Sequence, residues 1–175
     1  NDAYLRYIYT IYETGNPSRD YLIDFTVEEH NMSKYLDRAN AMDIAWGNRS
    51  NMNERSFQME NMATTIAYWE AEDDEMEDLA QDGDLEKVNG VDWIALKQQY
   101  FTSAIIPQSV EFSYADLAYQ TLPEKSGYIK EYSMAAAVPY TPQTDSYKFN
   151  FYLGPNKFPV LKKLTDADGN ALSLE

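Results

Sequence analysis

The chain of 175 residues contains no cysteine and a single histidine, His30. The lack of thiols excludes disulfides, zinc–thiolate sites, iron–sulfur clusters and a cysteine nucleophile, and it fits a cytosolic protein as well as a periplasmic one. A single histidine excludes a histidine-rich metal site. No segment approaches the roughly 18 apolar residues of a transmembrane helix. Thiol chemistry and histidine-based metal chemistry are therefore not expected.

Basic residues are scarce as well. Fourteen Lys and Arg stand against 29 Asp and Glu, which gives a formal charge of −15. This balance opposes nucleic-acid binding, in which Lys and Arg neutralise phosphates. It equally opposes electrostatic adsorption to an anionic lipid surface. The densest acidic run, within Glu70 to Glu86, is typical of a solvated loop or mobile edge. Nucleic acid is therefore not an expected partner.

Motifs for catalysis and metal binding are missing too. The sequence has no Gly-x-Ser-x-Gly elbow, phosphate loop or Gly-x-Gly-x-x-Gly turn. His30 follows a predicted strand in a polar stretch, which favours a surface or turn histidine. Residues 70–86 lack the ligand order of a calcium loop, and in Asp166-Ala-Asp-Gly-Asn170 the loop's glycine is replaced by Ala171, so a plain turn is expected. A close carboxylate pair, as in glycosidases, would arise by chance among 29 acids. We predict no catalytic residue, cofactor or metal, and binding residues stay unassigned.

Strand-forming residues are abundant, with 15 Tyr and 7 Phe. Tyr4 to Tyr12 is an unbroken run of this kind, and Tyr21 to Glu29 alternates between polar and apolar residues. Together they predict an antiparallel hairpin across a turn at Thr14 to Ser18. Further strands are predicted at Ala41–Trp46, Thr64–Trp69, Val110–Leu122, Tyr128–Pro139 and Ser146–Leu153.

The segments between these strands are turns, loops or short helices. Gly47 to Asn53 is a loop by composition, and Thr141 to Asp145 is a turn. A short helical turn is predicted at Ser33 to Arg38, whereas Phe57 to Met62 fits either strand or helix. Phe158 to Leu164 predicts one or two turns of helix, with Asn156 near its N-cap and Pro159 in its first turn.

The longest apolar stretch that is almost free of acid runs from Val91 to Pro107, after a predicted turn at Asn89-Gly90. Its periodicity fits a buried strand or a buried helix. Aromatic and β-branched residues favour strand, and the stretch divides into two strands joined near Gln98 to Tyr100. Strands separated by polar turns predict an all-β antiparallel sandwich. We expect one domain over residues 1–164 and a polar tail over 165–175.

The same stretch carries a family resemblance. Trp93-Ile-Ala-Leu-Lys-Gln-Gln-Tyr-Phe-Thr-Ser-Ala-Ile-Ile-Pro107 resembles the signature of the large periplasmic domain of the YidC family of membrane protein insertases. Tyr7-Ile-Tyr-Thr-Ile-Tyr, followed by Tyr21-Leu-Ile-Asp-Phe, is similar to the family's strand–turn–strand unit. Phe151-Tyr-Leu-Gly-Pro155 matches the strand that precedes its closing helix. Order and spacing agree from about Tyr4 to Leu164.

The resemblance implies a large, twisted, mutarotase-like supersandwich with a short C-terminal helix. The family's membrane-embedded core inserts membrane proteins, alone or with the Sec translocon, and that core is not in this chain. The implied role is accessory and non-catalytic: contact with Sec components such as SecDF, or a holding surface for nascent membrane proteins. The implied location is the periplasmic face of the bacterial inner membrane.

The resemblance also concerns the sheet edge. The family domain usually has strands before the point that corresponds to Asn1, so N-terminal strands of the full domain are expected to be missing. We therefore expect an exposed or partner-paired sheet edge at Tyr4 to Tyr12.

A different class of function is a carbohydrate-binding or carbohydrate-active sandwich, since sugars stack on aromatic faces. An exposed aromatic platform beside converging carboxylates would favour it, whereas burial of Trp46, Trp69 and Trp93 would favour a structural role. For Trp93, Tyr100 and Phe101 we prefer sandwich core or strand corner to a ligand cleft. Nothing specific supports a third class, a cell-surface adhesion sandwich.

Overall fold

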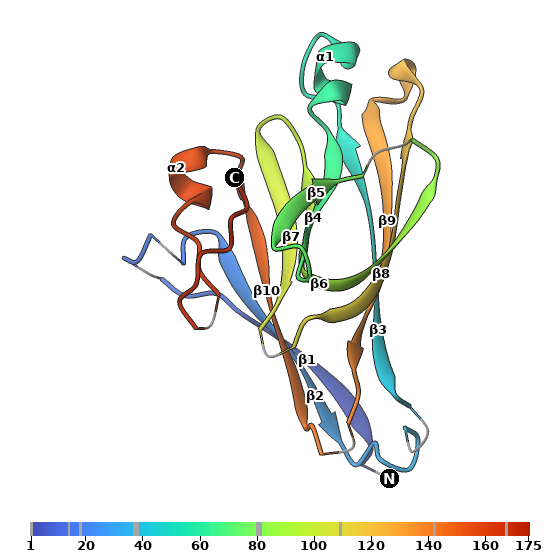
Figure 1. The fold of residues 1–175 in the computed structure, drawn as a ribbon, viewed down its shortest axis with the longest axis vertical. Helices are drawn as coiled ribbons and strands as arrows, with labels where there is room; N and C mark the ends of the chain where they lie inside the picture. Colours follow the sequence, from blue (N-terminus) through green and yellow to red (C-terminus); the bar gives the residue numbers. More distant parts are fainter. Residues whose placement is uncertain are drawn as a thin grey trace.

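The computed structural model describes residues 2–13, 15–17, 19–36, 39–79, 82–108, 110–141, 143–166 and 168–175. Within these residues ten strands form one antiparallel sheet, which confirms the all-β class (Figure 1). The strands are β1 (Tyr4–Thr10), β2 (Leu22–His30), β3 (Ala41–Asn51), β4 (Thr65–Glu70), β5 (Glu75–Asp78), β6 (Leu85–Lys97), β7 (Phe101–Pro107), β8 (Phe112–Thr121), β9 (Tyr128–Pro139) and β10 (Ser146–Pro155). The helical elements are α1 (Phe57–Met62), the 3-10 turn η1 (Glu124–Ser126) and the short C-terminal helix α2 (Phe158–Leu161).

The sheet curls about its long central strand, β6. The strand order is β1-β2-β10-β7-β6-β8-β9-β3, and β4 and β5 branch from β6. Residues 94–97 of β6 pair with β7 and residues 85–91 pair with β8, along the same edge, whereas β4 pairs along the opposite edge. One continuous sheet thereby supplies both layers of a sandwich: β1-β2-β10-β7 and β8-β9-β3.

The main core lies between these two layers. Because side chains alternate along a strand, Phe149 of β10 faces this core and stacks 6.3 Å, between ring centroids, from Phe112 of β8. A second core covers the outer face of β6, β7 and β10. There Trp93 and Tyr152 pack against leucines of α2 and of the residues that follow it, namely Leu161, Leu164, Leu172 and Leu174. Residues 165–175, expected as a polar tail, thus contribute two buried leucines to the fold.

Several predicted segments are confirmed. β1 and β2 form the expected antiparallel hairpin, and β9 has the predicted bounds. Val91 to Pro107 does contain two strands joined at Gln98 to Tyr100. Phe57 to Met62, which fitted either state, is helix α1 with Ser56 as its N-cap.

Other predictions were wrong, each because a distant partner overrides local composition. The loop predicted at Gly47 to Asn53 continues β3 as far as Asn51, since those residues pair with β9 and Arg49 forms an ion pair with Glu131. The turn predicted at Asn89-Gly90 lies inside β6, where Gly90 takes a φ of +63°.

Two further predictions hold in part. Of the solvated loop or mobile edge predicted at residues 70–86, the edge is present as strand β5, and the run also contains the start of β6. Asn156 does lie next to the N-cap of α2, which is Lys157, and its side-chain amide donates to the carbonyl of Gln98. Thr14, Ser18, Asp37, Arg38 and Pro142, which belong to predicted turns, lie outside the described residues.

Candidate functional site

The single histidine is not part of a site. His30 ends β2, is exposed, and stacks on Tyr4 with ring centroids 4.9 Å apart. No group of three or more His, Asp or Glu side chains with metal-binding geometry occurs in the described part of the chain. Nor is any helix within that part long and apolar enough to cross a membrane.

The aromatic residues of the central stretch divide between core and surface. Trp93 is 1% exposed and its indole Nε1 donates to the carbonyl of Leu172 at 2.7 Å, so it is a core residue. Tyr100 and Phe101 lie at the corner between β6 and β7 with exposed side chains. Trp46 and Trp69 are half-buried. The prediction of core or strand corner is therefore confirmed for Trp93, Tyr100 and Phe101.

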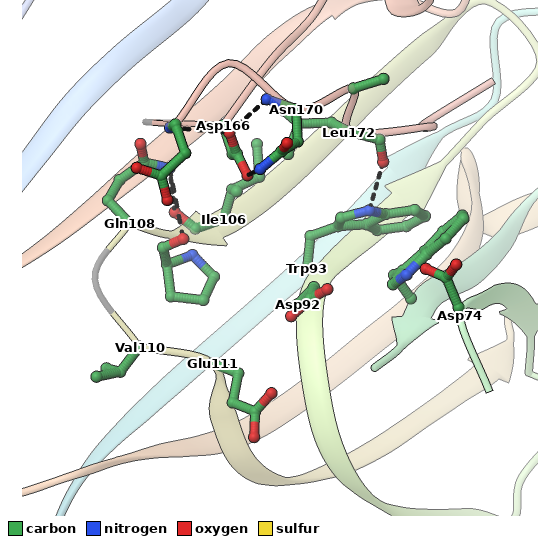
Figure 2. Close-up of a pocket in the computed structure, with 14 residues that line it drawn as sticks. Asp74, Asp92, Trp93, Ile106, Gln108, Val110, Glu111, Asp166, Asn170 and Leu172 are labelled. Carbon is green, nitrogen blue, oxygen red and sulfur yellow. Dashed lines mark hydrogen bonds between the residues drawn. The ribbon is translucent and has the colours of Figure 1, made fainter. Parts of the chain in front are cut away.

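An acid-lined cavity of about 450 Å³ lies beside Trp69 and Trp93. Figure 2 shows four separate segments reaching it: the β4–β5 turn, β6, the link between β7 and β8, and the turn after α2. These segments supply the carboxylates of Asp74, Asp92, Glu111, Asp166 and Asp168, and no described Lys or Arg lines the cavity.

The pKa values of two carboxyl groups in this cavity, Asp92 and Asp166, are shifted in opposite directions. Asp92 is exposed, but partial desolvation, followed by the charges of Glu111, Asp74 and Asp166, raises its pKa. The pKa of Asp166 is lowered despite its burial, because its carboxylate accepts hydrogen bonds from Asn170 and from the backbone of the same turn. Asp166 therefore acts as the fixed anion of a plain turn, as expected. Trp69 is the less buried of the two indoles, but it is not an exposed platform. The cavity therefore has the converging carboxylates expected of a sugar-binding site without the exposed aromatic face.

A second hollow, which we call the interlayer cleft, lies between β3 and the face of the β1-β2-β10-β7 layer. It has a volume of about 550 Å³. Its lining residues are Tyr9, Ile23, Phe25, Ile44, Ala45, Trp46, Gly47, Asn48, Ser103, Ile105, Phe151 and Leu153. None of these carries a charge, in a chain whose formal charge is −15.

The two sides of the interlayer cleft follow from strand alternation. On β3, Ile44 and Trp46 turn inward while Asp43 and Arg49 are exposed. On the facing layer, Phe25 and Phe151 form an aromatic floor, with ring centroids 5.5 Å apart. Trp46 meets Phe151 edge to face, with ring centroids 5.6 Å apart, so the two sides of the cleft are in contact there.

Two of the strands that line the cleft, β1 and β3, are edge strands. β3 pairs only with β9, and β1 pairs only with β2, so both are terminal strands within the described sheet. The edge expected at Tyr4 to Tyr12 is thereby confirmed. Tyr7 and Tyr9 of β1 stack on Phe25 yet remain 60% and 62% exposed. The apolar floor thus continues outward to a strand edge with free backbone groups.

Sequence patterns alone did not predict the interlayer cleft. Its residues come from five strands between Tyr9 and Leu153, and each belongs to an ordinary strand pattern. The one available signal is the excess of tyrosine in Tyr4 to Tyr12, more than one buried face requires. Only the curl of the sheet brings these residues opposite β3.

Comparison with known proteins relates most of the chain to one family. The model of the YidC periplasmic domain matches residues 14–173. A membrane protein insertase YidC of Azobacteroides pseudotrichonymphae is 30% identical over 165 residues, covering 92% of this chain and 26% of the relative. The protein of the same name from Bacteroides fragilis is 31% identical over 169 residues, covering 93% of this chain and 26% of the relative. The chain thus spans about a quarter of the length of these relatives.

Proposed function

The chain belongs to the family of YidC periplasmic domains, and on that basis we propose that it is a non-catalytic extracytoplasmic module that holds apolar segments of membrane proteins. The interlayer cleft is the observation that carries this proposal. The relatives are named membrane protein insertases, and the segments that such proteins handle are apolar. An uncharged cleft on a strongly acidic chain is complementary to a neutral apolar segment and unfavourable for an acidic one.

The open edges suggest how such a segment would bind. An extended segment in the cleft would pair its backbone with the free edge of β3 and place alternate side chains against Phe25 and Phe151. The edge supplies hydrogen bonds that do not depend on sequence, and the floor selects apolar side chains. This combination suits a holding surface for many different substrates.

The wider role follows from the same premise. We infer that the module is accessory to insertion and folding at the periplasmic face of the inner membrane, in contact with Sec components such as SecDF or with emerging polypeptide. No surface is assigned to Sec. That strands precede β1 in the full domain also remains a proposal. The carbohydrate alternative lacks its expected pattern among the described residues: the exposed Tyr7 and Tyr9 adjoin the uncharged interlayer cleft, whereas the converging carboxylates lie beside the half-buried Trp69.

A binding measurement tests the proposal. A dye-labelled peptide of alternating leucine and serine should raise its fluorescence anisotropy on binding the chain, and Ile44→Asn should weaken that binding. Losing one buried aliphatic contact is worth about 1.5–3 kcal/mol, or roughly tenfold to a hundredfold in Kd. Tyr35→Asn, at an exposed residue outside the cleft, is the matched control and should leave Kd unchanged. Equal losses in both variants, or no binding by the unaltered chain, would refute the proposal.

A crosslinking experiment tests the cleft in the whole insertase. A photoreactive residue at Leu153, which is 47% exposed and lines the cleft, should crosslink to a membrane protein during insertion. The same group at Tyr35 should not. Crosslinks from Tyr35 alone would place the polypeptide elsewhere on the domain.

A further inference from the structure

Exposed apolar side chains gather at one end of the molecule, outside the interlayer cleft. We call this the basic end and define it as residues 52–63, 97–101, 122–128 and 155–164. It contains α1, the β6–β7 turn, η1 and α2, which occupy the upper part of Figure 1, opposite the N-terminus. Its exposed large apolar residues are Met59, Met62, Tyr100, Phe101, Tyr128 and Phe158.

Hydrogen bonds join these segments into one surface. The backbone N–H of Met52 donates to the carbonyl of Gly127 at 3.0 Å, which ties the start of the α1 segment to η1. The Tyr100 hydroxyl donates to Glu54 Oε1 at 2.7 Å, which ties the same segment to the β6–β7 turn. The backbone N–H of Asn156, just before α2, donates to the carbonyl of Tyr100 at 2.7 Å.

The charge of this end is opposite to that of the rest of the chain. It contains six Lys and Arg against three Glu, a formal net charge of +3; Glu60 is buried, and Lys97 is half-buried, which lowers its pKa. The remaining residues hold eight Lys and Arg against 26 acids, a net charge of −18. Lys157, Lys162 and Lys163 are all exposed around α2. The total of −15 therefore conceals a strongly polarised molecule.

Cations and apolar rings are also close neighbours here. Lys162 Nζ lies 5.4 Å from the ring centroid of Phe158, whose side chain is 59% exposed. Lysines that keep their heads in water beside aromatic rings are typical of surfaces at a membrane interface. The exposed tyrosines of β1 differ, since they continue the cleft floor and the cation of β1, Arg6, is already paired with Glu28.

We propose that the basic end docks on an anionic phospholipid bilayer. Its lysines would attract the headgroups, while Met62 and Phe158 would insert their side chains at the boundary with the acyl chains. The acidic remainder would be repelled by the same surface. Attraction at one end and repulsion elsewhere would fix the orientation of the domain as well as its distance from the membrane. This inference does not depend on what the interlayer cleft binds.

Vesicle flotation tests the electrostatic part. The 175-residue chain should float with vesicles of 30% phosphatidylglycerol in phosphatidylcholine at low salt, and much less with pure phosphatidylcholine or at high salt. Lys157→Gln/Lys162→Gln/Lys163→Gln should weaken binding about fivefold for each lysine, roughly a hundredfold in all. The control, Lys34→Gln/Lys87→Gln/Lys148→Gln, changes the net charge equally at exposed residues elsewhere and should bind almost as well as the unaltered chain.

Single labelling sites test the orientation, because the chain has no cysteine of its own. An environment-sensitive dye on Met62→Cys or Phe158→Cys should shift to shorter wavelength on phosphatidylglycerol vesicles. A dye on Tyr35→Cys, in the β2–β3 connection at the opposite end (Figure 1), should not. The inference is overturned if no binding occurs at low salt, if both triple variants lose binding equally, or if all three labels shift alike. A surface that contacts only protein would give the first of these results.

Discussion

Replacing Leu174 by alanine removes a fully buried side chain from a segment that looks like a polar tail. Leu174 is 0% exposed and belongs to the second core, with Trp93, Tyr152 and Leu161. The same segment supplies the carbonyl of Leu172 to the indole of Trp93. The tail is therefore expected to stabilise the outer face of the sheet.

The size of the effect follows from burial. Leu→Ala at a well-packed position costs about 2–5 kcal/mol, and a domain of this length loses about 2–4 °C in Tm for each kcal/mol. We expect Leu174→Ala to lower Tm by roughly 4–20 °C. Removing residues 171–175 deletes two buried leucines, each of which stabilises the fold by about 1.5–3 kcal/mol. It also leaves the buried N–H of Trp93 without an acceptor, at a further cost of about 1–3 kcal/mol. That loss is comparable to the whole stability of a typical domain.

Urea unfolding followed by tryptophan emission measures these changes. The matched control is Leu153→Ala, at a leucine that is 47% exposed on the cleft face, and its free energy of unfolding should change by less than about 0.5 kcal/mol. If Leu174→Ala costs no more than Leu153→Ala, the tail does not stabilise the domain, and the account of the second core is wrong.

Three other changes test the packing and the electrostatics. A Cβ at Gly154 would lie 2.6 Å from the ring of Tyr152, so Gly154→Ala should cost about 1–3 kcal/mol in urea unfolding. Glu60 is buried and accepts from the backbone N–H groups of Asn53 and Glu54, so Glu60→Gln should cost about 1–3 kcal/mol, whereas a glutamine at an exposed glutamate should cost little. The pKa of Asp92 is raised above its ordinary value of 3.8 in the folded state, so stability should rise as pH falls from neutral towards that value. Asp92→Asn should raise Tm at pH 7 and reduce the gain seen at pH 5; an unchanged gain would contradict this assignment.

Local sequence was sufficient to predict the positions of most strands, because their residue patterns agree with their environment in the folded protein. β1, β2 and β9 are rich in Tyr, Ile, Phe or Ala, and their predicted and observed limits nearly coincide. β3 is the instructive exception. Its second half is Gly-Asn-Arg-Ser-Asn, a composition typical of loops. It forms a strand only because its backbone pairs with β9, whose residues lie about 80 positions further along the chain.

The interlayer cleft and the basic end could not be predicted from the sequence, for a different reason. The cleft depends on how far the sheet curls at β6, which no local pattern encodes. Gly90, with its φ of +63°, lies inside that strand. A turn was the natural prediction for Asn89-Gly90, since φ > 0 at glycine usually marks one. The uneven distribution of charge was hidden in the same way. Composition gives only the total of −15, and it is the fold that brings the lysines on either side of α2 near the residues around α1.

A single strand allows stability and binding to be separated. Along β10, Phe151 and Leu153 face the interlayer cleft, whereas Tyr152 and Gly154 face the second core. Changes at residue 154 should therefore lower the free energy of unfolding but leave the peptide affinity of the folded molecules unaltered. Leu153→Asn should do the reverse, because the side chain is already half in water and contributes little to the core. Neighbouring residues one position apart would then give opposite results in the two assays, which general destabilisation of the strand cannot produce.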